Sequence, residues 1–240
     1  PTDSLSGSGD SRTEPRMECN STYGAWYNSP AAVAMTGYGT YDIHDICPAG
    51  WRLPGKQSAD INSNTYLFDP VLAGEWNNGE LGYTSEAYYW TSELYGENSW
   101  TGRYIIDYDQ YGPGISMAGD LDYGRNIRCI LSSKEGTIQG ITYLQEVTPS
   151  IVSKSNNRST ATLIDSRDGQ EYTVGKLNNN LWMTRNLAIG CDGSGSSYGS
   201  NISPITLTAE SSNVGTTSWS TPSASLSLGN SYDEARIECD

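Results

Sequence analysis

Two groups of acidic residues in the first half of the chain have side chains of the type that binds cations. Asp107 and Asp109 flank Tyr108 in a strand pattern, so the two carboxylates share one face. Asp120 and Asp122 follow a few residues later. Calcium prefers oxygen ligands, and Asp107 with Asp109 could bind it together with loop carbonyls. The alternative is a solvated strand face, which the excess of negative charge in the chain favours.

Aromatic residues surround these carboxylates and could bind a glycan or a protein. Tyr and Trp rings offer flat stacking faces and can anchor a partner. The alternative is cross-strand packing that stabilises a twisted sheet. The predicted ligand-binding residues are Trp100, Tyr104, Asp107, Tyr108, Asp109, Tyr111, Asp120, Asp122 and Tyr123.

Few residues in the chain suit catalysis. His44 is the only histidine; it lies near Asp42 and Asp45, but a general base also needs a pocket and a substrate proton within reach. No G-x-S-x-G turn supports a serine triad, and no C-x-x-C pair supports zinc. We therefore expect no catalytic residue, no enzyme activity and no cofactor other than calcium. A weaker alternative is a glycan-active enzyme that uses two carboxylates.

Composition and charge exclude several classes of partner. The chain has 240 residues and a formal net charge of −14, from 28 acidic and 14 basic side chains. So acidic a chain repels nucleic acid and anionic lipid, which we exclude as principal partners. Five cysteines and a single histidine indicate an oxidising environment, so we expect a secreted or cell-surface protein. We find no apolar run that could span a membrane and no signal peptide, and we expect a mature or excised piece of a longer protein.

The candidate residues lie on predicted strands that alternate apolar and polar side chains. Strands are expected at 87–92 and 103–109, a turn at 111–115, and closing strands at 115–117 and 126–131. In the second half, a hairpin turn at 165–169 joins predicted strands 161–164 and 172–177. The remaining expected elements are a short helix at 31–35, a helical stretch at 58–72, a turn at 75–80 and a strand at 137–143.

Several motifs together resemble one family. Residues 47–54 read Cys-Pro-Ala-Gly-Trp-Arg-Leu-Pro, residues 88–92 read Tyr-Tyr-Trp-Thr-Ser, and residues 127–130 read Ile-Arg-Cys-Ile. With 163–187, which is similar to the family's opening hairpin, they resemble the Fibrobacter-type major paralogous domain (FISUMP) family of bacterial surface proteins. The resemblance implies an α+β, C-type-lectin-like fold with mixed and antiparallel twisted sheets, few short helices and long disulfide-held loops. The sugar-binding signatures E-P-N, Q-P-D and W-N-D of calcium-dependent lectins are absent.

The two ends of the chain repeat one another. Residues 9–20 align with residues 229–240 at an offset of about 220 residues, and we interpret this as an internal repeat. The family motifs occur in inverted order, and joining 136–240 to a further copy of 21–135 gives the same period. The identical positions are Gly9 and Gly229, Ser11 and Ser231, Glu14 and Glu234, Arg16 and Arg236, Glu18 and Glu238, and Cys19 and Cys239.

The repeat suggests a division of the chain. Residues 1–12 are expected to be a flexible lead-in, 13–135 the C-terminal part of one lectin-like domain, and 136–240 the N-terminal part of the next repeat. The alternative is a circular permutation in which 136–240 completes the same domain.

The resemblance and the repeat together suggest how the cysteines pair. Cys47 and Cys129 flank the lectin-like core and are expected to pair. Cys191 and Cys239 would form the second bond, which leaves Cys19 with a partner in another repeat. An odd cysteine in a secreted chain indicates bonding between copies or an incomplete unit.

We therefore expect a non-enzymatic, secreted cell-surface protein built of tandem disulfide-stapled lectin-like domains, as a structural or adhesive filament or stalk. Its partners would be copies of itself, with a glycan or a surface protein as a further ligand. The alternative is a single circularly permuted module that recognises a glycan or a protein through the Tyr/Asp-rich hairpins at 100–125.

Overall fold

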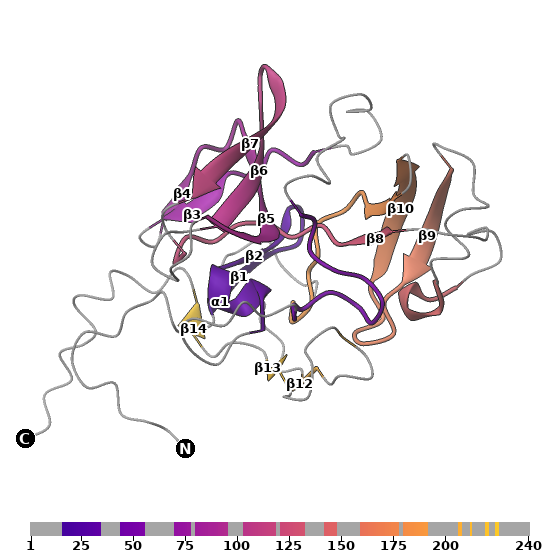
Figure 1. The fold of residues 1–240 in the computed structure, drawn as a ribbon. Helices are drawn as coiled ribbons and strands as arrows, with labels where there is room; N and C mark the ends of the chain where they lie inside the picture. Colours follow the sequence, from indigo (N-terminus) through magenta and orange to yellow (C-terminus); the bar gives the residue numbers. More distant parts are fainter. Residues whose placement is uncertain are drawn as a thin grey trace, which may run out of the picture.

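The computed structural model shows short strands gathered into small sheets around a shared core (Figure 1). The longer described stretches are 16–34, 44–55, 70–77, 80–95, 103–118, 121–132, 142–147, 159–177 and 180–191. Residues 206–207, 212, 219–220 and 224–225 are described as well.

The first sheet is built on strand β1 (Arg16–Asn20). On one side β1 pairs antiparallel with β2 (Gly24–Tyr27), and on the other it pairs parallel with β14 (Ala224–Ser225). Helix α1 (Ser29–Ala32) follows β2 and is fully buried. A strand from the start of the chain therefore lies between β2 and a strand near its end.

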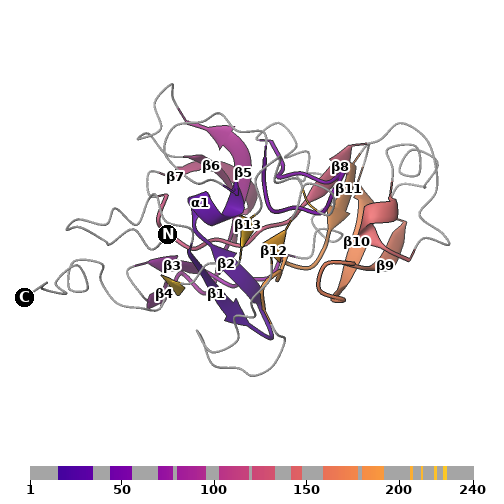
Figure 2. The ribbon, with the colours of Figure 1, turned by 90° about the horizontal axis from the view of Figure 1, so that it is seen from below.

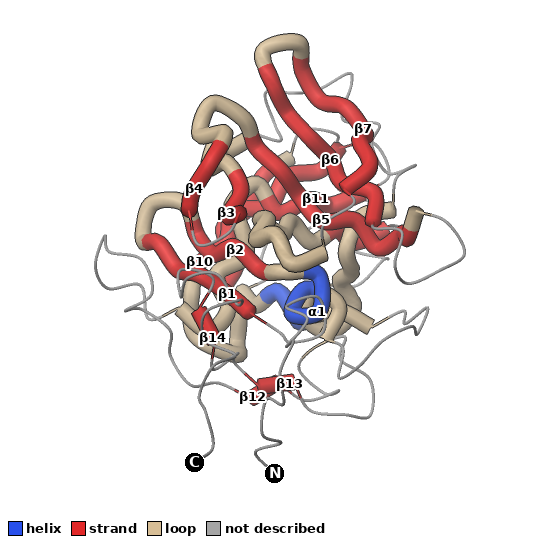
Figure 3. The backbone as a smooth tube through the Cα atoms, turned by 90° about the vertical axis from the view of Figure 1, so that its left-hand side faces the viewer, coloured by secondary structure: helices blue, strands red, loops and turns tan. Residues whose placement is uncertain are grey.

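A second sheet extends away from the rest of the protein. It contains β5 (Ala87–Leu94), β6 (Arg103–Asp109) and β7 (Gly112–Ala118), in that order and all antiparallel. The hairpin of β6 and β7 rises at the top of Figure 1, and the side view shows the same projection (Figure 3). A separate hairpin of β3 (Glu75–Asn77) and β4 (Glu80–Gly82) lies beside it.

The third sheet combines strands from both halves of the chain. Its order is β8 (Ile130–Ser132), β11 (Asn180–Met183), β10 (Glu171–Leu177) and β9 (Thr160–Ile164), as Figure 2 shows from below. β8 pairs with β11, so residues on either side of the predicted boundary near 135 share one sheet. The remaining pair is β12 (Thr206–Leu207) with β13 (Trp219–Ser220).

One hydrophobic cluster fills the space between the sheets. It extends from Met17 to Leu207 and includes the buried rings of Trp51 and Trp90. A buried hydrogen bond joins the two halves: the Trp51 indole N–H donates to Leu144 O over 2.9 Å. Segments 13–135 and 136–240 of this chain therefore pack on one another. The predicted division into parts of two repeats stays a prediction.

Local sequence patterns predicted several strands well. β5 and β6 confirm the strands expected at 87–92 and 103–109, and β9 with β10 confirms the hairpin around 165–169. Trp51 and Leu53 are buried while Arg52 between them is half-buried, which is the alternation typical of a strand with one buried face. The turn expected at 111–115 is wrong in place, since β7 already begins at Gly112.

The predicted α+β class is wrong. Where the structure describes the chain, the helices are the four-residue α1 and a three-residue 3-10 helix, η3 (Leu144–Glu146), and small, mostly antiparallel sheets predominate. The helix expected at 31–35 is short because Ala34 has a left-handed φ of 53°, which ends the α-helical turn. The helix expected at 58–72 lies mostly outside the described residues, and 70–72 are not helical. No described helix is long and apolar enough to cross a membrane.

Two disulfides close the structure. The predicted Cys47–Cys129 bond is confirmed. Cys191 pairs with Cys19 of the same chain, and this corrects the expected Cys191–Cys239 bond and the expected partner of Cys19 in another repeat. The repeat suggested Cys239 as the partner of Cys191, whereas the structure pairs Cys191 with Cys19, the residue equivalent to Cys239. Cys19 reaches Cys191 because the β1–β2 hairpin contacts residues 186–187. Cys239 lies outside the described residues.

Candidate functional site

The β6–β7 hairpin carries five of the predicted ligand-binding residues. Its turn consists of Gln110 and Tyr111, because Asp109 pairs with Gly112 across the two strands. The Asp109 Oδ1 accepts a hydrogen bond from the Tyr111 N–H over 2.7 Å and so fixes the turn. Gly112 permits it with a φ of 106°, which L side chains rarely adopt. The Tyr111 side chain is 88% exposed at the tip of the projecting hairpin.

The second acidic residue of the hairpin is held against the neighbouring strand. Asp107 Oδ2 accepts a hydrogen bond from the Ser116 hydroxyl over 2.7 Å. Asp107 also faces Gly114, where an added Cβ would lie 2.7 Å from Asp107 Oδ1. A larger residue at position 114 would therefore displace the end of the Asp107 side chain. Asp107 and Asp109 share one strand face, as predicted, and both make contacts that shape the hairpin.

The neighbouring aromatic residue has a structural role. The Tyr108 ring packs, partly buried, against a cluster on the opposite face of the sheet that includes Tyr89 and Trp182. Cross-strand packing, the structural alternative, therefore applies to Tyr108. Tyr104 lies on β6, but its side chain lies outside the described part of the structure.

The structure separates the remaining predicted residues from the hairpin. Asp122 and Tyr123 precede Asn126, which pairs with Tyr89 of β5. β6 pairs with the other edge of β5, so the β5 strand lies between the two groups. The Arg125 guanidinium lies 5.2 Å from the centre of the Tyr123 ring and forms an ion pair with Glu75 over 2.7 Å. Tyr123 therefore packs against Arg125. Trp100 and Asp120 lie outside the described residues. The nine predicted residues therefore do not form one site.

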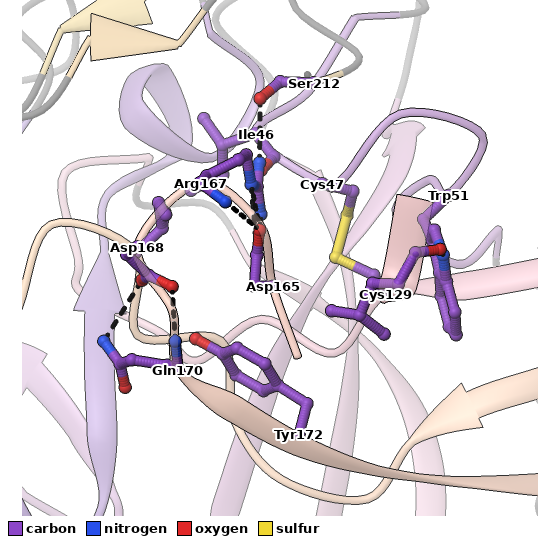
Figure 4. Close-up of polar contacts among 12 residues, drawn as sticks. Ile46, Cys47, Trp51, Cys129, Asp165, Arg167, Asp168, Gln170, Tyr172 and Ser212 are labelled. Carbon is purple, nitrogen blue, oxygen red and sulfur yellow. Dashed lines mark hydrogen bonds and ion pairs between the residues drawn. A yellow bond between two sulfur atoms is a disulfide. The ribbon is translucent and has the colours of Figure 1, made fainter. Parts of the chain in front are cut away.

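A buried polar cluster lies elsewhere, at the turn between β9 and β10 (Figure 4). The Arg167 guanidinium forms an ion pair with Asp165 over 2.6 Å, and both side chains are almost fully buried. Arg167 also donates to the backbone oxygen of Ile46 over 2.7 Å and to the hydroxyl of Ser212 over 2.9 Å. One guanidinium thereby joins three segments that are far apart in the sequence.

The same turn contains a second, less buried carboxylate. Asp168 accepts hydrogen bonds from the Gln170 backbone and side chain, and Gln170 Nε2 also donates to the backbone oxygens of Ala188 and Cys191. Burial raises the pKa of Asp168 to about 6, and although the Gln170 N–H lowers it, the nearby charge of Asp165 raises it further. The turn therefore connects directly to the backbone of the Cys19–Cys191 disulfide.

Two buried tyrosines complete this cluster. Tyr172 accepts a hydrogen bond from the Ala188 N–H over 3.0 Å, and the Tyr27 hydroxyl donates to Ile189 O over 2.7 Å. Burial raises the pKa of both phenols well above the ordinary value of 10.0, so both stay neutral at physiological pH. The tyrosines therefore fix the 188–191 backbone as hydrogen-bond partners.

A small pocket opens beside the disulfide. Its volume is about 50 Å³, whereas sites for small organic ligands usually measure roughly 300–1,000 Å³. The pocket could hold ordered water but is too small for a sugar ring. Its lining residues are Cys19, Asn20, Ser21, Gly24, Gln170, Arg185, Ala188 and Cys191.

The single histidine also lies among structural contacts. His44 is half-buried, and the neighbouring Asp45 is buried. Asp45 accepts hydrogen bonds from the backbone N–H groups of Cys47 (2.9 Å) and Leu53 (2.8 Å), so its carboxylate braces the turn between them. Within the described residues, no three His, Cys, Asp or Glu side chains group as metal ligands.

Comparisons with known proteins do not assign the chain to a family, so the functional argument depends on the contacts described above. No protein-family model, curated protein or solved structure matches the chain. The resemblance to the FISUMP family stays a prediction from the motifs.

The sequence predicted the 165–169 turn but not the burial of its Asp165 and Arg167 side chains. An Asp/Gly-rich stretch between two strands is typical of an exposed hairpin turn. In this protein, however, the turn has hydrogen-bond partners in distant segments of the chain. A usable signal was present in Arg167, because an arginine between two aspartates can pair within its own turn.

Replacing Asp168 by asparagine should change how stability depends on pH. The folded carboxyl, with a pKa of about 6, binds its proton more tightly than the unfolded one, with an ordinary value of 3.8. The stability that this proton contributes is complete below about pH 4 and is lost as the pH rises to about 6. The new amide oxygen would still accept from Gln170, and the amide would not titrate. In thermal melts, the melting temperature of the variant relative to the wild type should therefore rise from about pH 4 to 6 and stay at that higher value above about pH 6. A difference that is constant with pH would contradict the assignment.

Replacing Arg167 by Met should destabilise the protein by about 3–5 kcal/mol, because it leaves the buried Asp165 carboxylate without its counter-charge. Urea unfolding measures the loss. Arg185→Met is the control, because Arg185 is exposed and its guanidinium donates to a backbone oxygen, that of Glu171. Its loss leaves no buried carboxylate without a counter-charge and should cost about 1 kcal/mol or less. Equal losses in the two variants would rule out the structural role of Arg167.

Proposed function

We propose that this chain is a unit of a secreted, non-enzymatic surface protein whose copies assemble into a structural or adhesive filament or stalk. The observation that carries the proposal is that residues 236–240 repeat the sequence of strand β1 at three of its five positions, Arg236, Glu238 and Cys239. The first copy is β1, in which residues 17–20 are buried and Cys19 is bonded to Cys191. The second copy, at 236–240, ends in Cys239 and Asp240. A repeated core strand suits a protein built from many identical units.

The two disulfides support a location outside the cell. Disulfides persist in oxidising environments and are rare in the cytosol. Cys19–Cys191 and Cys47–Cys129 both lie in the core, and Cys19–Cys191 joins the two halves covalently. The FISUMP-like motifs support the same location on a bacterial surface.

The use of the acidic side chains supports a non-enzymatic role. Asp45 braces a turn, Asp165 pairs with Arg167, and Asp109 fixes the β6–β7 turn. A glycosidase needs two carboxylates across a cleft that admits a sugar. These three carboxylates instead accept hydrogen bonds from their own fold. Calcium remains an expectation at Asp107 and Asp109, which a melting comparison with and without chelator would test.

Assembly of the oxidised full chain tests the proposal. Light scattering over a series of concentrations should show multimers whose mean mass rises with concentration, because head-to-tail contacts that do not close into a ring add further copies. Electron microscopy of the same samples should show linear particles. A monomer at every concentration, together with no binding to bacterial surfaces, would overturn the proposal.

The exposed tip of the β6–β7 hairpin supports a second candidate, a contact with a glycan or a surface protein. Tyr111 is 88% exposed there, and Ile115 on the same hairpin is 38% exposed. An aromatic side chain on a rigid hairpin loses little conformational freedom when it binds.

Replacing Tyr111 by Ala should weaken binding of a ligand found by glycan and protein arrays by about tenfold or more. Tyr143→Ala is the control, because Tyr143 is also exposed, at 41%, and lies beside η3. Equal binding by the Tyr111 variant and the wild type would exclude the hairpin tip as the contact.

A further inference from the structure

We propose that residues 229–240 supply strand β1 to a second copy of this chain, and that Cys239 takes the place of Cys19 in the bond to that copy's Cys191. This inference rests on the proposed self-assembly and names the contact that produces it. The inference is based on the structure of the β1 position and on the two segments of the sequence that match it.

The β1 position is a buried slot with defined partners. Met17 pairs with Tyr27, Glu18 with Trp26 and Cys19 with Ala25 along strand β2. The side chains of Met17, Glu18 and Cys19 are 0% exposed. A strand in this slot must therefore provide an apolar side chain, a glutamate and a cysteine in that order.

The C-terminal segment meets each of these requirements. Ile237 replaces Met17 with an apolar side chain of similar size, and β-branched residues favour strands. Glu238 and Cys239 are identical to Glu18 and Cys19.

The residue after the cysteine is matched as well. Asn20 Oδ1 accepts hydrogen bonds from the N–H groups of Thr22 (2.9 Å) and Tyr23 (3.1 Å). An Asp240 carboxylate is able to accept the same two bonds. The second copy of the sequence can therefore replace these contacts of β1.

The rest of the slot does not depend on which chain supplies the strand. The edge of β2 away from β1 is held by its own partners, since Tyr27 exchanges backbone hydrogen bonds with Arg125 over 2.9 Å and the Ala25 N–H donates to Leu187 O over 3.3 Å. Strands of equal fit can exchange between copies at little cost in contact energy, as in domain swapping. Three residues separate β14, which lies beside β1, from Gly229.

The covalent step needs no external oxidant. The Cys239 thiolate attacks the Cys191 sulfur of the second copy, the Cys239–Cys191 bond forms, and the Cys19–Cys191 bond breaks. Its electron pair leaves on the Cys19 sulfur, which takes up the proton that Cys239 lost. The number of disulfides is unchanged, and the link between copies becomes covalent.

Disulfide mapping of full-length Cys19→Ser protein tests this pairing. The substitution leaves Cys191 without its partner, and oxidised glutathione serves as the oxidant. Equal amounts of ¹⁴N- and ¹⁵N-labelled chains are mixed unfolded, refolded and digested. We expect a Cys191–Cys239 peptide of which about half carries both isotopes, as random pairing between chains requires. Absence of this peptide, or only single-isotope forms of it, would overturn the inference.

A synthetic peptide of residues 229–240 provides a second measurement, on the Cys19→Ser, Cys239→Ser double variant. The peptide should form a mixed disulfide with Cys191 and raise the melting temperature. The matched control is the same peptide with Ile237→Asp, which would place a carboxylate in the fully buried position of Met17. An equal effect of both peptides would show disulfide chemistry without strand binding and overturn the inference.

Light scattering of the wild type and Cys239→Ser separates this inference from the proposed function. Multimers of the wild type alone support both. Multimers of both proteins leave assembly intact and overturn the role of Cys239. If the wild type and Cys239→Ser are both monomers but Cys19→Ser gives the mixed-isotope peptide, the pairing is supported and assembly as the function is overturned.

Discussion

The packing of strand β1 against the backbone of residues 186–191 is the constraint on which the rest of the structure depends. β1 lies between β2 and β14, and its cysteine bonds to Cys191. Tyr27, Tyr172 and Gln170 also hold the 188–191 backbone, through buried and partly buried hydrogen bonds. Unpaired buried polar groups cost stability, so these bonds fix one arrangement of the two halves.

Patterns within short stretches predicted the parts of the fold that depend on local interactions. Alternation of side chains found β5, β6 and the β9–β10 hairpin, because one face of each strand is buried. The α+β class was wrong because the family resemblance implied helices that the described residues do not show. The partner of Cys191 was wrong because that pairing depends on tertiary packing, which leaves no trace in sequence spacing.

The candidate site shows the same division. The shared face of Asp107 and Asp109 followed from strand periodicity. The turn was expected too late in the chain, because it consists of Gln110 and Tyr111 and β7 begins at Gly112. That β5 separates Asp122 and Tyr123 from the hairpin could not be predicted, because strand order is a property of the sheet. The Arg167 cluster was missed for a related reason, since its partners Ile46 and Ser212 are remote in the sequence.

The intrachain disulfide has a mechanical consequence for a protein that carries tension along its chain. Cys19 and Cys191 are 172 positions apart, and most of the described strands lie between them. A force applied at the two ends of the chain reaches Cys19 from one side and Cys191 from the other. It then passes through the covalent S–S bond, so the sheets enclosed by that bond bear no load. Under tension only the segments outside the bond can extend, and the enclosed fold keeps its shape.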